Sequence, residues 1–432
     1  MADVCVIGAG SSGLTSIKAL LDQGLDVDCF ELGSDLGGNW RQGNDNGRSA
    51  AYDSLRIDTS KERMAYRDLP MPDDWPPYLH HTQVLEYFER YAETFDLRRS
   101  ITFRTRVTDV RPAPDGGWDV TTEPAGGGDA ETRRHRAVLV ANGHHWDPHL
   151  PSWPGSFDGR ILHSREYRSP EAFSGRRVLV VGIGNSGTDI AVDLTGEAAH
   201  VSLSTRRGAH VIPRFILGRP TDQWATRFSS RLPLPLARAL YRVLLNAARG
   251  RQRRYGVPEP PNRLLEEHPT MSQEFLPLVR DGAITVRPDI HTLEGDAVRF
   301  VDGSAAEFDA VVAATGYTIS FPFLPWLEVR DNDIGLYRKV VHPDHPGLFF
   351  IGLIQPLGAI MPLAEAQARW VARLLRGAPL PSTAEMKRSI AADRAALEHR
   401  YVPSRRHTIQ VDYFPYLDLM DAEVAAADRV LV

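Results

Sequence analysis

The sequence predicts an α/β fold with two Rossmann-like dinucleotide-binding domains. A glycine fingerprint, Gly8-Ala-Gly-Ser-Ser-Gly13, directly follows the apolar run Val4–Ile7. A second fingerprint, Gly182-Ile-Gly-Asn-Ser-Gly187, directly follows the run Val178–Val181. Each fingerprint opens a helical pattern, so each has the strand–turn–helix context that the motif requires. One such motif is weak evidence for a nucleotide site, whereas two motifs that both have this context are strong evidence for two sites.

The glycines have defined physical roles in this motif. The first permits a tight turn, the second lets the backbone approach a pyrophosphate, and the third lets the helix pack on the strand. The helix that follows points its N-terminal amides and its positive dipole end at the phosphates. We therefore expect phosphate contacts near Gly8, Gly10 and Gly13 in the first motif, and near Gly182, Gly184 and Gly187 in the second.

The end of the second strand in each domain predicts which cofactor is bound. In the first domain Glu31 closes the strand Val27–Phe30. A carboxylate at this point accepts hydrogen bonds from a ribose 2′-hydroxyl and repels a 2′-phosphate. The matching position of the second domain holds Thr205, Arg206 and Arg207, and guanidinium groups bind phosphate bidentately. The first site is therefore predicted to bind FAD and the second NADPH.

The order of the patterns predicts that the NADPH domain is inserted into the FAD domain. The first part of the FAD domain covers residues 1–155 and ends at a Pro-rich hinge. The NADPH domain covers residues 156–312, and residues 313–432 return to the FAD domain and form a C-terminal segment. Later buried strands are expected at Ala310–Ala314 and Leu348–Ile351.

A helical insert at about 209–265 stands apart within the NADPH domain. It is rich in arginine, and Leu236, Leu240, Val243, Leu244 and Ala247 form an apolar stripe at helical spacing. A basic amphipathic helix can lie on a membrane surface. A lid, a surface helix that covers the domain, or a contact in a homodimer would show the same pattern, and these alternatives stay open here.

Composition excludes several functional classes. The 432 residues suffice for two or three domains, and 50 basic against 55 acidic residues give no reason to expect nucleic acid as a partner. No apolar run is long enough to span a membrane and no signal peptide is present, so a cytoplasmic location is expected. Cys5 and Cys29 lie on neighbouring predicted strands as inert core thiols, which argues against a disulfide reductase. No zinc-site spacing occurs, so no metal is expected.

The segment between the two fingerprints resembles a known signature. Phe157-Asp-Gly-Arg-Ile-Leu-His163-Ser-Arg-Glu-Tyr167 is similar to the FxGxxxHxxxY motif of the flavin-containing monooxygenases, the class B flavoprotein monooxygenases. Further stretches resemble the same family in the same order over nearly the whole chain: 31–40, 55–62, 68–70, 184–191, 314–317, 352–356 and 406–412.

The resemblance implies an FAD- and NADPH-dependent monooxygenase. In this family NADPH reduces FAD, reduced FAD takes up O2 as a C4a-hydroperoxide, and a soft nucleophile takes the distal oxygen. N- or S-oxygenation of a small molecule is therefore expected, with Asp58 and Ser186 as the catalytic candidates. Beyond the residues already named, the resemblance implies cofactor contacts from Ser11, Ser12, Gly38, Asn39, Trp40, Asp58, Thr59, Val107, Asn185, Ser186, Thr188, Asp189, Thr315, Gly316 and Gln355.

One residue departs from the family pattern. The family usually has an asparagine beside the flavin where this chain has Asp58. An ionised carboxylate only accepts hydrogen bonds, and it would disfavour a deprotonated peroxyflavin by like-charge repulsion. Burial would raise the pKa of such a carboxyl, and its protonated form could still donate a hydrogen bond. Asp58 could also be a harmless near-isostere of the asparagine.

Two other functions remain open at this point. A Baeyer–Villiger monooxygenase acting on a ketone is slightly favoured by Asp58. Its related signature generally ends in Trp, however, where this chain has Tyr167. An NADPH oxidase or a nucleotide sensor would use the same two sites without an organic product.

Overall fold

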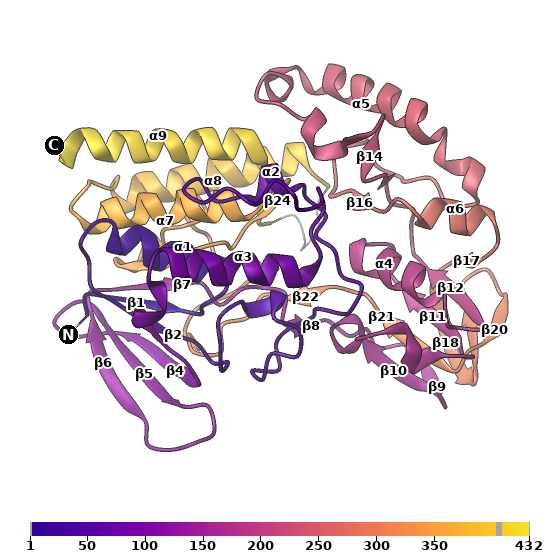
Figure 1. Ribbon diagram of the computed structural model, residues 1–432, viewed down its shortest axis with the longest axis horizontal. Helices are drawn as coiled ribbons and strands as arrows, with labels where there is room; N and C mark the ends of the chain where they lie inside the picture. Colours follow the sequence, from indigo (N-terminus) through magenta and orange to yellow (C-terminus); the bar gives the residue numbers. More distant parts are fainter. Residues whose placement is uncertain (1, 403–407, 432) are drawn as a thin grey trace. The chain divides into compact units, whose positions relative to one another are not determined.

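The computed structural model describes residues 2–402 and 408–431 (Figure 1). The chain forms two compact units. The first unit comprises Met1–Ser49, Thr59–Asp147 and Thr318–Val432, and the second comprises Ala50–Asp58 and Pro148–Tyr317. The segment Ala50–Asp58 thus clusters with the second unit, although the chain on both sides of it belongs to the first.

The first unit is built on a parallel five-stranded sheet. Its order is β23 (Leu348–Phe350), β7 (Ala137–Val140), β1 (Val4–Ile7), β2 (Val27–Phe30) and β3 (Ile101–Thr102). The central strand β1 pairs in parallel register with both neighbours, so that Val4 lies opposite Val27 and Ala137. The first fingerprint therefore follows the middle strand of the sheet, as in a Rossmann fold.

Helix α1 (Ser11–Leu21) packs on β1 and β2, and further helices complete this unit. They are α2 (Lys61–Met64), α3 (His81–Thr94), α7 (Met361–Leu375), α8 (Thr383–Arg400) and α9 (Tyr413–Leu431). The buried helix α7 packs against both α1 and α9, which Figure 1 shows in yellow along α7. Capping boxes start α3 at His80 and α8 at Ser382, where a side chain accepts a hydrogen bond from the first turn.

The second unit repeats the same sheet plan. Its parallel strands are β10 (Arg160–His163), β21 (Ala310–Ala313), β11 (Arg177–Val181), β12 (His200–Ser204) and β17 (Ile284–Arg287), in that order. Helices α4 (Asn185–Leu194) and α6 (Phe275–Arg280) pack on this sheet. The second fingerprint follows β11, which is again the middle strand. The predicted α/β fold with two Rossmann-like domains is confirmed.

Smaller sheets complete each unit. The first unit has the antiparallel sheet β4 (Thr105–Pro112), β5 (Trp118–Pro124) and β6 (Glu131–His135), and the pair β24 (Gln355–Leu357) and β25 (Gln410–Asp412). The second has the sheet β20 (Ala305–Glu307), β19 (Ala297–Phe300), β18 (Ile290–Gly295) and β9 (Gly155–Phe157). It also has the pairs β13 (Val211–Ile212) with β16 (Thr270–Met271), and β14 (Phe215–Ile216) with β15 (Arg219–Pro220). Strands β8 (Asp147–Pro148) and β22 (Tyr317–Thr318) lie where the chain passes between the units.

The helix of the insert is α5 (Leu234–Arg249) in the second unit. Leu245 is buried, and Leu244 packs beside it against Ile212 and Leu264. Leu236, Leu240 and Val243 are 55%, 46% and 66% exposed. The stripe that the sequence suggested as one apolar face is therefore split: Leu244 packs inward, and the other four members, which include Ala247, are exposed.

Both cysteines lie in the buried core of the first unit. Cys5 and Cys29 are buried free thiols on the paired strands β1 and β2, and burial raises the pKa of both well above the usual range. A thiol that stays protonated is a poor nucleophile, which agrees with their expected inert role. Within residues 2–402 and 408–431, no helix is long and apolar enough to cross a membrane.

Candidate functional site

The first fingerprint forms a turn that only glycine fits at two of its positions. Gly8 has φ +100°, and a Cβ there would lie 2.8 Å from the carbonyl oxygen of Ala141. A Cβ on Gly13 would lie 1.9 Å from the carbonyl oxygen of Gly8. Gly10 differs, since its Cβ would come no closer than 3.8 Å, to the Cα of Gly38. The protein's own packing leaves space at Gly10, which fits a position reserved for a phosphate.

Two distant segments of the first unit approach this turn through glycine. A Cβ on Gly38, which has φ +53°, would lie 3.2 Å from the Cα of Gly10. A Cβ on Gly352 would lie 2.1 Å from Ser12 Oγ. The predicted residues Asn39 and Trp40 continue from Gly38 in a short 3-10 turn, and Ser11 and Ser12 begin α1. The structure thus gathers the predicted phosphate-binding residues of the first unit around one turn.

Glu31 is buried directly after β2 and is bonded to the fingerprint itself. Its Oε2 accepts a hydrogen bond from the backbone N–H of Ala9 at 2.8 Å. Its Oε1 accepts from the N–H of Gly33 at 2.8 Å and from Asn46 Nδ2 at 3.2 Å. A carboxylate has about four acceptor sites, so capacity for a ribose hydroxyl remains. That ribose contact stays a prediction.

The second fingerprint repeats the geometry of the first. Gly182 has φ +115°, and a Cβ on Gly187 would lie 1.9 Å from the carbonyl oxygen of Gly182. Asn185 Oδ1 accepts from the N–H of Met271 at 2.9 Å, which ties the turn to β16. Ser186 is exposed in the first turn of α4, where a phosphate oxygen would meet free amides. The buried Thr188 instead donates to the carbonyl oxygens of Gly184 and Asn185.

The basic residues after β12 have unequal surroundings. Thr205 is buried, and its hydroxyl donates to the carbonyl oxygen of Arg207 at 2.6 Å. Both Arg206 and Arg207 are exposed. Arg207 Nη2 lies 3.4 Å from Glu267 Oε2, whereas no ion pair of Arg206 occurs in the part of the chain that the structure describes. A 2′-phosphate would therefore meet one paired and one unpaired guanidinium.

Asp58 belongs to a partly buried charge cluster that the sequence did not reveal. Arg214 Nη2 lies 3.4 Å from Asp58 Oδ1 and 3.4 Å from Asp189 Oδ1. Tyr52 donates its hydroxyl to Asp189 Oδ2 at 3.3 Å, and Glu274 lies 3.8 Å from Arg214 Nη1. Arg214 is thus bracketed by carboxylates from the segment 50–58, from α4 and from the loop before α6.

The electrostatics of this cluster revise the sequence argument about Asp58. Burial raises the pKa of Asp58 to about 6 and raises the pKa of Asp189 well above its usual value, while Arg214 opposes both shifts. The Arg214 guanidinium therefore neutralises part of the negative charge of Asp58. This weakens the repulsion between Asp58 and a peroxyflavin that the sequence alone predicts. Arg214 is 156 residues from Asp58 in sequence, and no local pattern marks it as a partner.

The segment that carries the family signature forms the edge strand β10 of the second sheet and continues to Tyr167, which contacts α4. Gly159 lies against the carbonyl oxygen of Asp309. A Cβ at position 159 would lie only 2.5 Å from this oxygen. His163 Nε2 hydrogen-bonds the carbonyl oxygen of Gly316 at 3.0 Å, and buried Tyr167 donates to Asp193 Oδ2 at 2.6 Å. These contacts hold the segment against the end of β21 and against α4.

The remaining predicted residues belong to both units. Thr315 donates its hydroxyl to the carbonyl oxygen of His149 at 2.5 Å, next to Gly316. Val107 lies in β4, and Gln355 begins β24, where its N–H donates to Ile409. Thr59 begins the second stretch of the first unit.

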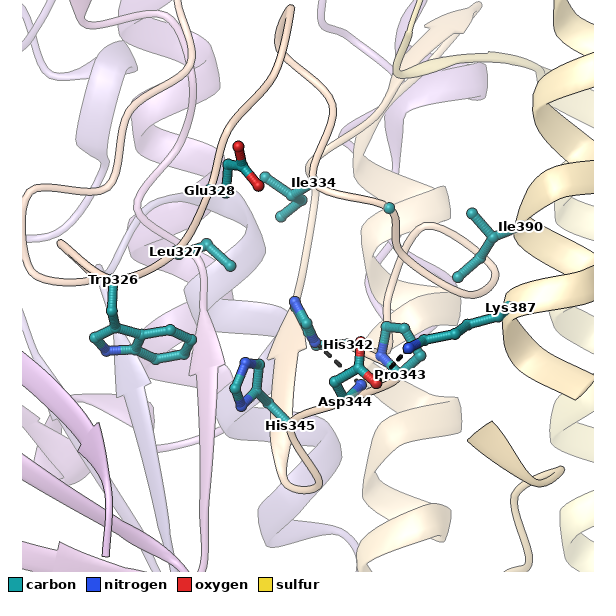
Figure 2. Close-up of a pocket in the computed structure, with 11 residues that line it drawn as sticks. Trp326, Leu327, Glu328, Ile334, His342, Pro343, Asp344, His345, Lys387 and Ile390 are labelled. Carbon is teal, nitrogen blue, oxygen red and sulfur yellow. Dashed lines mark hydrogen bonds and ion pairs between the residues drawn. The ribbon is translucent and has the colours of Figure 1, made fainter. Parts of the chain in front are cut away.

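A pocket in the first unit contains none of the predicted site residues (Figure 2). It encloses about 400 Å³ between the segment 326–345 and α8. The rings of His342 and His345 lie 4.5 Å apart, and Lys387 Nζ pairs with Asp344 at 2.6 Å. Burial lowers the pKa of His342 to about 4, so its imidazole is neutral near pH 7. Among the described residues no group of three or more His, Cys, Asp or Glu could hold a metal ion.

Comparisons with known proteins agree with this arrangement of two nucleotide units. The flavin-binding monooxygenase-like family model matches residues 1–432. Human flavin-containing monooxygenase 5 is 42% identical over 438 residues, which cover 96% of this chain and 81% of that protein. Human flavin-containing monooxygenase 2 is 40% identical and is covered to 82%.

Solved structures show the same fold. The S-allyl-L-cysteine S-oxygenase of Allium sativum matches with a TM-score of 0.74 at 25% identity, over 98% of this chain and 88% of that one. An open crystal structure of cyclohexanone monooxygenase matches with a TM-score of 0.72 at 21% identity, over 99% and 98% of the two chains. An oxidised steroid monooxygenase bound to NADP matches with a TM-score of 0.72 at 20% identity, over 100% and 98%.

Proposed function

This chain belongs to the flavin-binding monooxygenase-like family and is an FAD- and NADPH-dependent monooxygenase, and we propose that it transfers one oxygen atom of O2 to a soft nitrogen or sulfur nucleophile of a small molecule. The main support from the molecule itself is the presence of two fingerprints with the same geometry, one in each unit. Two such turns suit two dinucleotides, and an enzyme with both can pass a hydride from one to the other.

We assign FAD to the first unit. The open space at Gly10, the first amides of α1 and the close approach of Gly38 form a cradle for its pyrophosphate. Glu31 keeps acceptor capacity for the adenosine ribose. Bound FAD, once reduced, supplies the reaction with O2 that no side chain can perform.

We assign NADPH to the second unit. The exposed Ser186 and the amides at the start of α4 would receive the pyrophosphate, and Arg206 with Arg207 would receive the 2′-phosphate. Thr188, buried and bonded to its own helix, would stiffen this turn without touching the cofactor. Arg214 would hold α4 and the segment 50–58 in place through Asp189 and Asp58.

One observation favours Baeyer–Villiger chemistry as the second candidate. The guanidinium of Arg214 next to Asp58 can offset negative charge at low dielectric. Attack on a ketone carbonyl needs an oxygen donor that keeps its negative charge, whereas transfer to an amine or thioether does not. Tyr167 argues against this reaction, because the related Baeyer–Villiger signature generally ends in Trp at this position. Tyr167 is buried and donates a hydrogen bond to Asp193.

Product analysis with ¹⁸O2 tests the proposal. The purified yellow protein is given NADPH and, in parallel, a tertiary amine, a thioether and a cyclic ketone, and the products are identified by mass spectrometry. We expect one ¹⁸O atom in an N-oxide or sulfoxide for each NADPH consumed. An ester or lactone as the main product would support the second candidate. NADPH consumption that yields only H2O2 with all three classes would contradict both. A homodimer and a cytoplasmic location stay predictions.

A further inference from the structure

Glu267 is a buried carboxylate beside one of the two arginines assigned to the 2′-phosphate. Its side chain is 9% exposed, and its Oε2 lies 3.4 Å from Arg207 Nη2. Oε2 also accepts a hydrogen bond from Asn262 Nδ2 at 3.3 Å. Its other oxygen, Oε1, is buried and has no hydrogen-bond partner within residues 2–402 and 408–431. Glu267 therefore has acceptor capacity that the protein itself leaves unused.

The local fold brings Glu267 to Arg207. Strands β13 and β16 pair in parallel, with Val211 opposite Thr270. Arg207 lies four residues before Val211 and Glu267 lies three residues before Thr270, so both precede the same end of this parallel pair. Next to Arg207, Gly208 packs against the backbone of residues 258–259, where a Cβ would lie 2.1 Å from the carbonyl oxygen of Pro258. Thr270 in turn donates to the carbonyl oxygen of Ile183 inside the fingerprint at 2.7 Å, so Glu267 is anchored to the nucleotide turn.

We propose that Glu267 sets the coenzyme preference of this enzyme: it competes with the 2′-phosphate for Arg207 and so keeps NADH usable beside NADPH. This inference rests on the assignment of Arg206 and Arg207 to the phosphate. A phosphate dianion can only accept hydrogen bonds, so Glu267 repels it. A ribose 2′-hydroxyl can donate to the same carboxylate. Arg206, which lacks such a competitor among the described residues, supplies the remaining preference for NADPH.

Coenzyme binding to the FAD-loaded enzyme tests this role directly. Dissociation constants for NADP⁺ and NAD⁺ are measured by isothermal titration calorimetry on wild type and Glu267→Gln. We expect NADP⁺ to bind the variant about five-fold more tightly, the size of one partly solvated charge interaction. NAD⁺ should bind equally or more weakly. The matched control is Glu266→Gln, whose carboxylate pairs with Arg238 at 3.0 Å and should leave both constants unchanged.

A second variant shows whether the effect passes through Arg207. In an Arg207→Gln background, Glu267→Gln should tighten NADP⁺ binding less than it does in the wild type, because only the direct repulsion of the phosphate by Glu267 remains. One outcome would contradict the role of Glu267 and leave the phosphate site in place. In it, Arg207→Gln alone weakens NADP⁺ binding, whereas Glu267→Gln changes neither dissociation constant or weakens NADP⁺ binding. If neither Arg206→Ala nor Arg207→Gln changes the ratio of the two constants, the phosphate site itself is wrong and the inference is wrong with it. Flavin content and the thermal unfolding curve confirm that each variant is folded.

Discussion

At Asp58, burial and an ion pair act in opposite directions on one carboxyl group. Burial raises its pKa to about 6, and Arg214 at 3.4 Å lowers it. The family usually has an uncharged amide at this place, so the charge of Asp58 is the property most open to test. Around neutral pH the carboxylate is largely ionised, and Arg214 must serve both Asp58 and Asp189.

We expect Asp58→Asn to reduce the share of NADPH-derived electrons that end in H2O2, because it removes a negative charge that repels peroxide. Arg214 already neutralises part of this charge, so the reduction should be about two- to five-fold. The raised pKa sets the window: wild-type leakage should rise between pH 5 and pH 7 as the carboxyl ionises, and the variant should not share this rise. Peroxide and NADPH are assayed together across this range. Asp53→Asn, exposed on the same segment, is the control. Equal leakage in wild type and variant at every pH would show that Asp58 is only an isostere.

His342 in the pocket of Figure 2 gives a prediction about stability. Burial lowers its pKa from 6.5 to about 4, so the unfolded chain binds a proton more readily than the folded one between these values. The free energy of unfolding should therefore fall as the pH is lowered from about 6.5 to about 4. His342→Gln keeps an acceptor for the N–H of Asp344 and should make this fall shallower in urea titrations. His200→Gln, on an exposed histidine, should leave the slope as in wild type.

At the scale of single elements, α5 separates exposed from buried apolar residues on one helix. Leu245 is 4% exposed and Leu240 is 46% exposed. We expect Leu245→Ala to lower the free energy of unfolding by about 2–5 kcal/mol, because it leaves a cavity beside Ile212 and Leu264. Leu240→Gln should change it by less than about 0.5 kcal/mol. Chemical denaturation of both variants checks this, and a large loss from Leu240→Gln would mean that the stripe is covered in solution.

The sequence predicts best those elements whose bounds are set by neighbouring residues in the chain. β1 and β2 have the expected bounds, Val4–Ile7 and Val27–Phe30, because a short apolar run before a glycine turn leaves few alternatives. The split stripe of α5 was missed because helical spacing does not say which apolar residues find a partner. Arg214 and Glu267 were missed for a related reason. Each acts through a residue 25 or more positions away, and chain distance carries no local signal.

At the scale of the molecule, the chain uses one sheet plan twice. In both units the fingerprint follows the middle of five parallel strands. In both, a Cβ on the last glycine of the fingerprint would lie 1.9 Å from the carbonyl oxygen of the first glycine. The two Rossmann-like domains were therefore predictable from two short motifs. The assignment of Ala50–Asp58 to the second unit was not, since it depends on Tyr52 packing on Tyr167 and on the N–H of Asp53 donating to Arg168.

This repetition predicts that the two cofactors can be lost separately. In Gly13→Ala or Gly187→Ala, the new methyl group would meet backbone at 1.9 Å, so the turn must open. We expect Gly13→Ala to purify without flavin absorbance. Gly187→Ala should keep FAD that dithionite reduces, but NADP⁺ should bind at least about ten-fold more weakly, a loss of about 1.4 kcal/mol.

Gly10→Ala is the control that separates fold from ligand. Its Cβ would come no closer than 3.8 Å to the protein, and its φ of −79° suits any residue, so the apoprotein should fold as wild type does. If the FAD pyrophosphate lies against Gly10, the methyl group occupies its place and the folded variant stays colourless. Wild-type flavin content in Gly10→Ala would contradict this placement of the pyrophosphate. Loss of FAD from Gly187→Ala would contradict the independence of the two sites.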